Sequence, residues 1–359
     1  MNNLIVFIGG HHNSTLEVAK SAQKNNFQTL WLGHKFNHSD NKSFSAEYQE
    51  VTLAKIPFLE LKTGRFYKKI NFFEVLKIIF GFFQAAYYLL KYRPALVFSS
   101  GGYMAVPVVV VAYLLRIPSL THEQTVVSGW ANKAIAPFVK KVLLTHAVSE
   151  ENYPKQKSEV VGLPVRAELV DKNNSKIFHP KLLYVTCGKQ GSHLVNDALF
   201  PLIPTLVKKF TIVHQVGSNV LTKDLDRARR IKERLGVNAN RYQYAPYYFG
   251  KDSATYLRSA DIVISRAGAH TIYELIVLNK KAVVIPISWV SHQEQLKNAE
   301  LAKKEIECEI LEEQTLNSEY LLNAITKMDK LPKKRVPTNL KNNVAEKIVS
   351  IIKSEIAKS

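Results

Sequence analysis

Cysteine is scarce in this chain of 359 residues, which contains only Cys187 and Cys308. Two cysteines so far apart provide neither a disulfide framework nor a cysteine-rich zinc site, and they fit a reducing cytoplasm. The N-terminus lacks a basic region followed by a long apolar stretch, so we expect no signal peptide.

The common nucleotide and catalytic fingerprints are also missing. No GxGxxG, GxxxxGK[ST] or GxSxG pattern occurs, which argues against dinucleotide, P-loop and serine-hydrolase sites. Asp224 and Asp226 mimic a DxD metal motif, but they lie in a charged helical stretch rather than after a strand. His11 and His12 are adjacent and lack spaced partners. We therefore expect no metal and no cofactor.

Acidic residues are outnumbered, with 30 Asp and Glu against 49 Lys and Arg, which gives a formal net charge of +19. Such an excess favours polyanionic partners, namely nucleic acid, anionic lipid surfaces or phosphorylated substrates. The expected strands carry no aromatic and basic stacking motif, so we expect no nucleic acid partner. Anionic lipid surfaces and phosphorylated substrates remain as the expected polyanionic partners.

No clean apolar run reaches the roughly 20 residues needed to span a bilayer. Residues 72–90 come nearest, but Glu74, Lys77 and Gln84 interrupt them. This stretch is either a buried helix of an α/β domain or a helix whose aromatic face enters a lipid interface. Basic residues flank it on both sides, at Lys62, Arg65, Lys68, Lys69, Lys91 and Arg93.

Short β-branched runs alternate with longer helical stretches, which predicts an α/β fold with two Rossmann-like domains. We expect domains at residues 1–163 and 164–335, and a helix in residues 336–359 that packs back on the first domain. The expected strands are residues 4–8, 28–32, 95–99, 119–122, 141–144 and 159–161, then 181–186, 211–215, 261–265, 282–287 and 309–311.

The strongest chemical signal is DIVISRAGAHTIYELI, residues 261–276. A strand, a turn at Arg266–Ala269 and a helix start present free amides that suit a diphosphate. Glu274, one turn into the helix, offers two oxygens to a ribose diol. This order is typical of a nucleotide-sugar site, although an ordinary turn with a solvated Glu274 has the same pattern.

Two further stretches fit the same site. Glu294, Gln295 and Asn298 share a face of an expected helix and can bind sugar hydroxyls. The loop CGKQG, residues 187–191, follows another strand, and its amides and Lys189 suit a phosphate. A solvated helix and a plain turn are the alternatives.

In the first domain, polar loops follow three strands. Because the carboxyl ends of parallel strands lie at one edge of a sheet, these loops together favour a second binding site. They contain Gly9 and Gly10; Gly101, Gly102 and Tyr103; and His122, Glu123, Gln124 and Thr125.

Taken together, the motifs GGYMAVP, HEQ, GLPVR, SRAGAHTIYEL and EQLKNA resemble, in this order, the MurG-like glycosyltransferases of family 28. The resemblance spans roughly residues 4–325. It implies the glycosyltransferase B-type fold, with two domains that face each other across a cleft. The implied reaction is an inverting, metal-independent transfer of N-acetylglucosamine from UDP to a polyprenyl-diphosphate-linked sugar, the step from lipid I to lipid II in peptidoglycan synthesis.

The resemblance also implies roles for individual residues. His11 would be the catalytic base, in a loop about three residues shorter than the family's, and Gly9 and Gly10 would lie on the acceptor side. Thr125 replaces the asparagine of the family's HEQN, and Lys189 replaces a serine, which bears on the acceptor more than on the donor. The implied donor-binding residues are Arg166, Lys189, Gln190, Gly191, Gly250, Arg266, Gly268, Ala269, His270, Thr271, Glu274, Glu294, Gln295 and Asn298.

A lipid-linked acceptor stays in the bilayer, so the resemblance favours the interfacial interpretation of residues 62–93 at the cytoplasmic face of the cell membrane. Three alternatives are retained. A UDP-N-acetylglucosamine 2-epimerase would share the architecture without a membrane helix, and another glycolipid glycosyltransferase would differ in its acceptor. A basic nucleic-acid-binding protein would show salt-sensitive binding that UDP does not displace.

Overall fold

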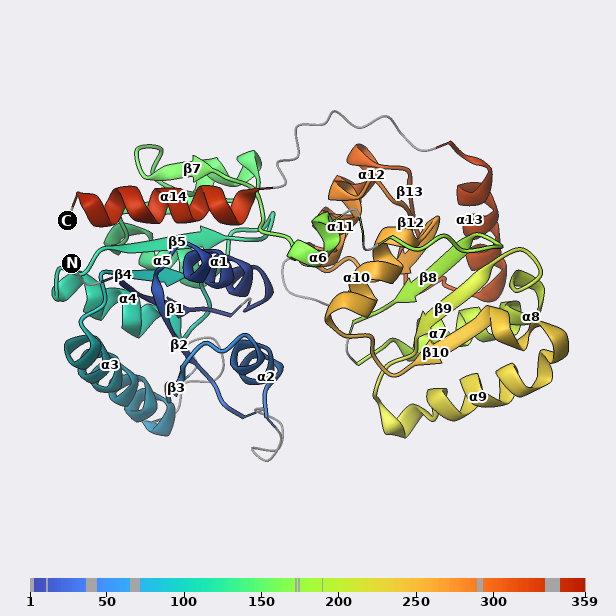
Figure 1. The fold of residues 1–359 in the computed structure, drawn as a ribbon, viewed down its shortest axis with the longest axis horizontal. Coiled ribbons are helices and arrows are strands. Elements are labelled where there is room, and N and C mark those ends of the chain that lie inside the picture. Colours follow the sequence, from blue (N-terminus) through green and yellow to red (C-terminus); the bar gives the residue numbers. More distant parts are fainter. Residues whose placement is uncertain are drawn as a thin grey trace. The chain divides into compact units, whose positions relative to one another are not determined.

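The chain folds into two compact units, Met1–Val165 with Lys341–Ser359, and Arg166–Leu340 (Figure 1). Each unit is described by itself. The computed structural model describes residues 3–10, 12–36, 44–64, 72–171, 173, 175–188, 190–288, 293–332 and 343–358.

The first unit is built on a seven-stranded parallel sheet with the order β3-β2-β1-β4-β5-β6-β7. Its central strands are continuous apolar runs because helices cover both faces of the sheet. The strands are β1 (Leu4–Ile8), β2 (Gln28–Gly33), β3 (Phe58–Glu60), β4 (Leu96–Ser99), β5 (Ser119–Glu123), β6 (Lys141–Leu144) and β7 (Ser158–Val160).

Helices close two hydrophobic cores, one on each face of this sheet. The C-terminal helix α14 packs against α1, and its Ile348 and Ile352 are fully buried there. The helices are α1 (His12–Lys24), α2 (Ala46–Leu53), α3 (Phe72–Tyr92), α4 (Ala105–Leu114), α5 (Trp130–Ile135) and α14 (Val344–Ala357).

Among the described residues, α3 is the one helix long and apolar enough to cross a membrane, by length and composition alone, with 21 residues and a mean hydropathy of 1.4 over a window of 18 of them. Gly81, Ala85 and Leu89 are buried at intervals of four, and α3 packs against α4. One face of α3 is therefore part of the first unit's core, and the remaining faces stay exposed.

The second unit contains a six-stranded parallel sheet with the order β10-β9-β8-β11-β12-β13. Its strands are β8 (Leu182–Thr186), β9 (Thr211–Gln215), β10 (Tyr242–Ala245), β11 (Ile262–Ser265), β12 (Lys281–Val284) and β13 (Cys308–Ile310). Its helices are α6 (Ala167–Val170), α7 (His193–Leu199), α8 (Ile203–Leu206), α9 (Asp224–Arg234), α10 (Gly250–Ser259), α11 (Ala269–Val277), α12 (Glu294–Glu305) and α13 (Ser318–Lys330).

The strand order reverses once in each sheet, between β1 and β4 in the first and between β8 and β11 in the second. In doubly wound sheets, ligands bind beyond the carboxyl ends of the strands at this reversal. The loops after these four strands are therefore the places where a site is expected. The two parallel sheets with helices on both faces confirm the predicted α/β class with two Rossmann-like folds.

The differences from the expected elements have local causes. Strands β3 and β10 were not predicted from the sequence. Both are short edge strands with partly exposed side chains and no apolar run. Helix α5 ends at Ile135, and Ala136–Phe138 forms a 3₁₀ turn. Pro137 explains that ending, because proline lacks the amide hydrogen that the next helical turn needs.

Candidate functional site

The loop after β11 leads directly into α11, whose N-cap residue is Gly268. As a glycine, the N-cap residue supplies no capping side chain, and a Cβ built on Gly268 would have open space around it. The first-turn amides therefore face an accessible space with the positive end of the helix dipole behind them. Predicted donor residues Ala269, His270 and Thr271 form this turn, a geometry that can hold an anion.

Glu274 lies one turn further along α11 and pairs with Arg166. Nε and Nη2 of Arg166 donate to the two carboxylate oxygens at 3.0 and 3.1 Å. Burial alone lowers the pKa of Arg166, but the charge of Glu274 outweighs it, and the net effect raises that pKa. Arg166 therefore stays protonated, and the structure brings these two predicted donor residues together at the start of the second unit.

Arg266, the third predicted charged residue here, supports the loop itself. Its guanidinium donates to Ile285 O at 3.2 Å, to Ser192 Oγ at 2.7 Å and to Glu313 Oε1 at 2.6 Å. These contacts tie together segments that follow β8, β12 and β13. The position of Arg266 is thus fixed by the protein, and Glu313 balances its charge.

The loop after β8 is shaped by a close approach of two glycines. Gly191 has a φ of +74°, and a Cβ there would overlap the Val216 carbonyl and Gly217. Gln215 fixes the same loop, because its Nε2 donates to Gly188 O at 2.9 Å. The predicted residue Gln190 lies in the turn, whereas Lys189 lies outside the described residues.

Gly250 begins α10, and no side chain caps that helix either. A Cβ on Gly250 would meet nothing within 4 Å, so the main chain at this predicted donor residue is open to a ligand. The neighbouring ring of Phe249 is 67% exposed. An exposed aromatic ring beside open amides can stack on a base, and the sequence reading missed this ring although it immediately precedes the predicted glycine.

The predicted sugar ligands on α12 differ in accessibility. Asn298 is only 1% exposed, and its Nδ2 donates to Ala267 O at 3.0 Å. Gln295 Oε1 accepts from the Ile287 amide at 3.0 Å. Both side chains therefore form hydrogen bonds with main chain that flanks the site. Glu294 is partly buried at the start of the helix.

In the first unit, the loops after β1 and β4 touch. The Gly10 amide donates to Gly101 O at 3.1 Å, and a Cβ on Gly102, whose φ is +78°, would lie 2.9 Å from the Gly10 nitrogen. The structure therefore brings these predicted glycines together at the strand-order reversal. The predicted base, His11, lies outside the described residues.

The HEQT segment, His122 to Thr125, is buried and satisfied within the protein. Nε2 of His122 is 2.9 Å from Gly162 O, and Gln124 Nε2 donates to Thr15 Oγ1 at 3.5 Å. Each of its four residues is at most 5% exposed. These predicted acceptor residues therefore shape the loop edge of the sheet more than they present side chains to solvent.

Glu123 is the centre of a buried network that the sequence reading did not foresee. Its Oε2 accepts from the Tyr153 hydroxyl and the Gly129 amide, each at 2.7 Å, and from Asn132 Nδ2 at 3.2 Å. Its Oε1 accepts from Thr125 Oγ1 at 3.1 Å. Tyr153 follows a 3₁₀ turn rather than a strand, so examining the residues after each predicted strand could not identify it.

His34 was not predicted as a site residue from the sequence. It directly follows β2, so examining the residues after each strand would have identified it. Its Nε2 is hydrogen-bonded to the hydroxyl of Tyr103, 2.5 Å away. The predicted acceptor residue Tyr103 is thereby held toward the ends of β2 and β3.

One cluster among the described residues has metal-ligand chemistry, formed by His193, Asp197 and Asp224. The guanidinium of Arg227 already contacts both aspartates. His193 Nδ1 lies 3.0 Å from Asp224. The guanidinium of Arg227 thus already binds one oxygen of each carboxylate, and we assign no metal to the cluster.

The comparisons with known proteins extend over both units. Residues 9–144 match the glycosyltransferase family 28 N-terminal domain, and residues 182–354 match the glycosyltransferase family 28 C-terminal domain. Curated relatives share the name UDP-N-acetylglucosamine–N-acetylmuramyl-(pentapeptide) pyrophosphoryl-undecaprenol N-acetylglucosamine transferase. That of Clostridium novyi is 32% identical over 81% of this chain and 82% of its own length. That of Legionella pneumophila is 29% identical over 99% and 98%.

Solved structures agree on the fold. The MurG of Acinetobacter baumannii superimposes with a TM-score of 0.70 at 22% identity, covering 98% of this chain and 99% of that one. A putative UDP-N-acetylglucosamine 2-epimerase from Listeria monocytogenes superimposes with a TM-score of 0.68 at 12% identity, covering 99% and 97%. At these identities the structural matches establish the shared architecture alone.

Proposed function

Because the chain belongs to glycosyltransferase family 28, we propose that it transfers N-acetylglucosamine from UDP-N-acetylglucosamine to a polyprenyl-diphosphate-linked sugar. The acceptor we propose is the undecaprenyl-diphosphate N-acetylmuramyl-pentapeptide named in its relatives, which makes the reaction the step from lipid I to lipid II. The observation that carries this proposal is the match of those relatives along nearly the whole chain, through both units.

For the donor, we propose that the diphosphate of UDP binds the uncapped first turn of α11. Main-chain amides there would stabilise the negative charge that grows on the departing UDP. Glu274, oriented by Arg166, would accept hydrogen bonds from the ribose hydroxyls. The open amides at Gly250 beside Phe249 support a place for the uracil ring.

For the acceptor, the proposed base is His11, which would remove the proton of the attacking sugar hydroxyl. One displacement would then form the new glycosidic bond at the anomeric carbon, break the bond to UDP and invert the configuration. His12 offers a matched control, because its Nε2 already pairs with Glu50 at 3.1 Å. We expect His11→Ala to lower kcat by about a hundredfold or more and His12→Ala to lower it far less. Normal turnover of His11→Ala would remove it from the mechanism.

We further propose that the first unit binds the cytoplasmic face of the cell membrane through residues 62–93. Exposed apolar side chains along α3 support this proposal, with Phe73, Phe83 and Leu90 being 70%, 72% and 57% exposed. Such a helix lies in the lipid interface while its buried face stays docked on the protein. The net charge of +19 favours anionic lipid.

The deciding experiment is a transfer assay with labelled UDP-N-acetylglucosamine and a panel of polyprenyl-diphosphate sugars. We expect label in lipid II when lipid I is the acceptor, and the same rate in EDTA because no metal takes part in the proposed reaction. Transfer to another lipid-linked sugar would correct the acceptor. Conversion of the donor to its 2-epimer without any acceptor would overturn the proposal.

A further inference from the structure

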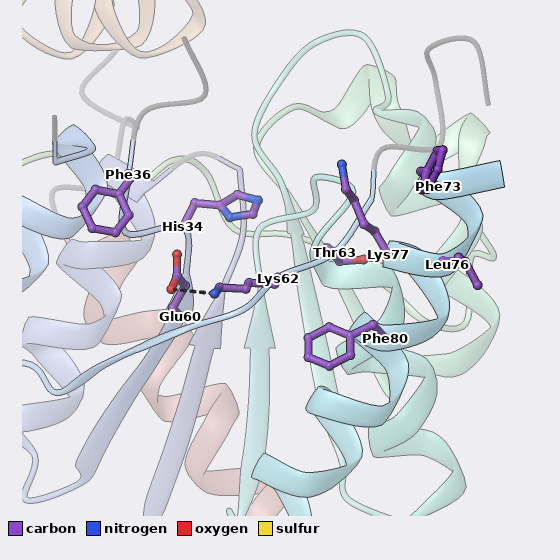
Figure 2. Close-up of a pocket in the computed structure, with 9 residues that line it drawn as sticks. All are labelled: His34, Phe36, Glu60, Lys62, Thr63, Phe73, Leu76, Lys77 and Phe80. Carbon is purple, nitrogen blue, oxygen red and sulfur yellow. Dashed lines mark ion pairs between the residues drawn. The ribbon is translucent and has the colours of Figure 1, made fainter. Parts of the chain in front are cut away.

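A cavity of about 700 Å³ lies in the first unit, between the carboxyl ends of β2 and β3 and the first turns of α3. Figure 2 shows His34, Phe36 and Lys62 on the strand side and Phe73, Lys77 and Phe80 on the α3 side. Because the strands are parallel, this cavity lies at the same sheet edge as the loops after β1 and β4. The membrane proposal uses the outer face of α3 and assigns no ligand to the cavity itself.

The wall between the strands and α3 is closely packed. A Cβ on Gly81 would lie 2.5 Å from Thr63 Oγ1, and a Cβ on Gly64 would lie 2.5 Å from the Glu74 carbonyl oxygen. Thr63, which lines the cavity, is 8% exposed, and its hydroxyl has no hydrogen-bond partner among the described residues. This hydroxyl lies against Gly81 of α3, so it forms part of the wall and does not point at the space of the cavity.

The two lysines of the cavity are held loosely. Lys62 Nζ lies 3.9 Å from Glu60, and Lys77 Nζ lies 2.8 Å from Glu74. The side chains of both lysines are more than 60% exposed, so these ion pairs contribute little to stability. Both ammonium groups can therefore turn toward a more highly charged anion at small cost.

The apolar part of the cavity continues out along α3. Phe73, Leu76 and Phe80 occur at helical spacing and are followed on the same face by Phe83, Tyr87 and Leu90, each at least 46% exposed. At 1.5 Å per residue this stripe is about 25 Å long. It begins beside the two lysines, so one end of the stripe is cationic and the rest is apolar.

We infer that this cavity binds a prenyl diphosphate, with the diphosphate between Lys62 and Lys77 and the first isoprenoid units against Phe73 and Phe80. The inference rests on the proposed function, since it assigns a place to the lipid part of the proposed acceptor. Charge complementarity at the two lysines favours the diphosphate. The apolar stripe favours a long hydrocarbon chain attached to it.

The cavity also connects to the predicted acceptor loop. His34 lines the cavity and is hydrogen-bonded to Tyr103 of the GGY loop. A ligand whose diphosphate lies in the cavity therefore places its attached sugar near the loops after β1 and β4. In this arrangement the sugar, the diphosphate and the chain of one acceptor each contact a different part of the first unit.

The test is calorimetric titration of the full chain with geranyl diphosphate, a water-soluble probe, with UDP present in saturating amount so that it fills any phosphate site in the second unit. We expect the Lys62→Gln, Lys77→Gln double variant to bind about tenfold more weakly, because two charge-assisted contacts are lost. Phe80→Ala should also lose about tenfold, because its ring covers the isoprenoid.

Matched variants outside the cavity separate specific binding from surface effects. Leu221→Ala removes an exposed apolar side chain from the second unit, and Lys91→Gln removes a charge at the far end of α3; each should change the affinity by less than about twofold. Equal binding of geraniol would overturn the inference, since the diphosphate would then contribute nothing. So would displacement of the probe by a short-chain phosphatidylglycerol, which would make this a general phospholipid site.

The failure of this inference can be told from a failure of the proposed function. If the double lysine variant keeps the normal KM for the lipid-linked acceptor while transfer proceeds, the cavity assignment is wrong and the transferase stands. If geranyl diphosphate binding depends on Lys62, Lys77 and Phe80 but no acceptor receives the sugar, the site stands and the proposed reaction is wrong.

Discussion

Arg166 and Glu274 form a two-point ion pair, in which Nε and Nη2 of the arginine each contact one carboxylate oxygen. The pair joins the first residue of the second unit to the middle of α11. A carboxylate held at both oxygens has a fixed orientation, and each oxygen keeps a lone pair for a further donor. Glu274 can therefore be rigid and still accept hydrogen bonds from the ribose hydroxyls in the role proposed for it.

Glu274→Gln should raise the KM for UDP-N-acetylglucosamine by about tenfold or more, because a neutral amide replaces a charged acceptor of hydrogen bonds. The KM for the acceptor should change little, since no acceptor role is assigned to this residue. Steady-state kinetics with each substrate varied in turn checks this. Glu319→Gln, an exposed change at the start of α13, is the control, and an equal effect of both changes would contradict the assignment.

Tyr153→Phe should destabilise the first unit by about 1–2 kcal/mol, because Glu123 loses one hydrogen-bond donor while its buried carboxylate remains. Glu123→Gln should cost more, since an amide nitrogen then faces groups that are themselves donors. Urea unfolding measures both free energies. Tyr320→Phe, on an exposed tyrosine, serves as the control; a loss as large as that of Tyr153→Phe would show that the network is not the cause.

The Glu123 network is a feature that could not be predicted from the sequence. The position of the HEQT segment at the end of β5 could be predicted, because parallel strands place such loops at one edge. Which side chains point to a ligand depends on distant partners such as Tyr153 and Asn132, and no local spacing encodes those contacts.

The same limit applies in the second unit. The strand, turn and helix of residues 261–276 could be predicted because glycine and apolar periodicity are local signals. The burial of Asn298 against the Ala267 carbonyl could not, because two segments about 30 residues apart have to meet. The edge strands β3 and β10 could not be predicted for a related reason, because they are defined by pairing with a neighbouring strand and not by an apolar run.

Glu47 should make the stability of the first unit depend on pH. Burial raises the pKa of Glu47 from 4.5 to about 7, although Trp31 Nε1 donates to its carboxylate at 2.7 Å. Between these two values the folded state binds more protons than the unfolded state, so stability falls as pH rises from about 4.5 to about 7.

Glu47→Gln removes this titration. The free energy of unfolding of the variant minus that of the unmodified protein should increase by about 1–3 kcal/mol from pH 5 to pH 8. Urea unfolding of both proteins at the two pH values measures that change, and comparing the proteins cancels titrations that they share. A difference between the two proteins that stays constant with pH would contradict the raised pKa.

The exposed face of α3 should determine membrane binding. Phe83→Ser and Leu90→Ser each replace a side chain that is more than half exposed, and each should weaken binding to anionic vesicles by about tenfold, because about 1.5 kcal/mol of apolar burial in lipid is lost. Leu221→Ser is the matched control, since Leu221 is 88% exposed in the second unit and far from α3 in the sequence. Vesicle flotation measures all three variants at one salt concentration, because attraction between the basic protein and anionic lipid weakens as salt rises. If Leu221→Ser reduced flotation as much as Leu90→Ser, exposed apolar area in general would cause binding, and α3 would have no special part in it.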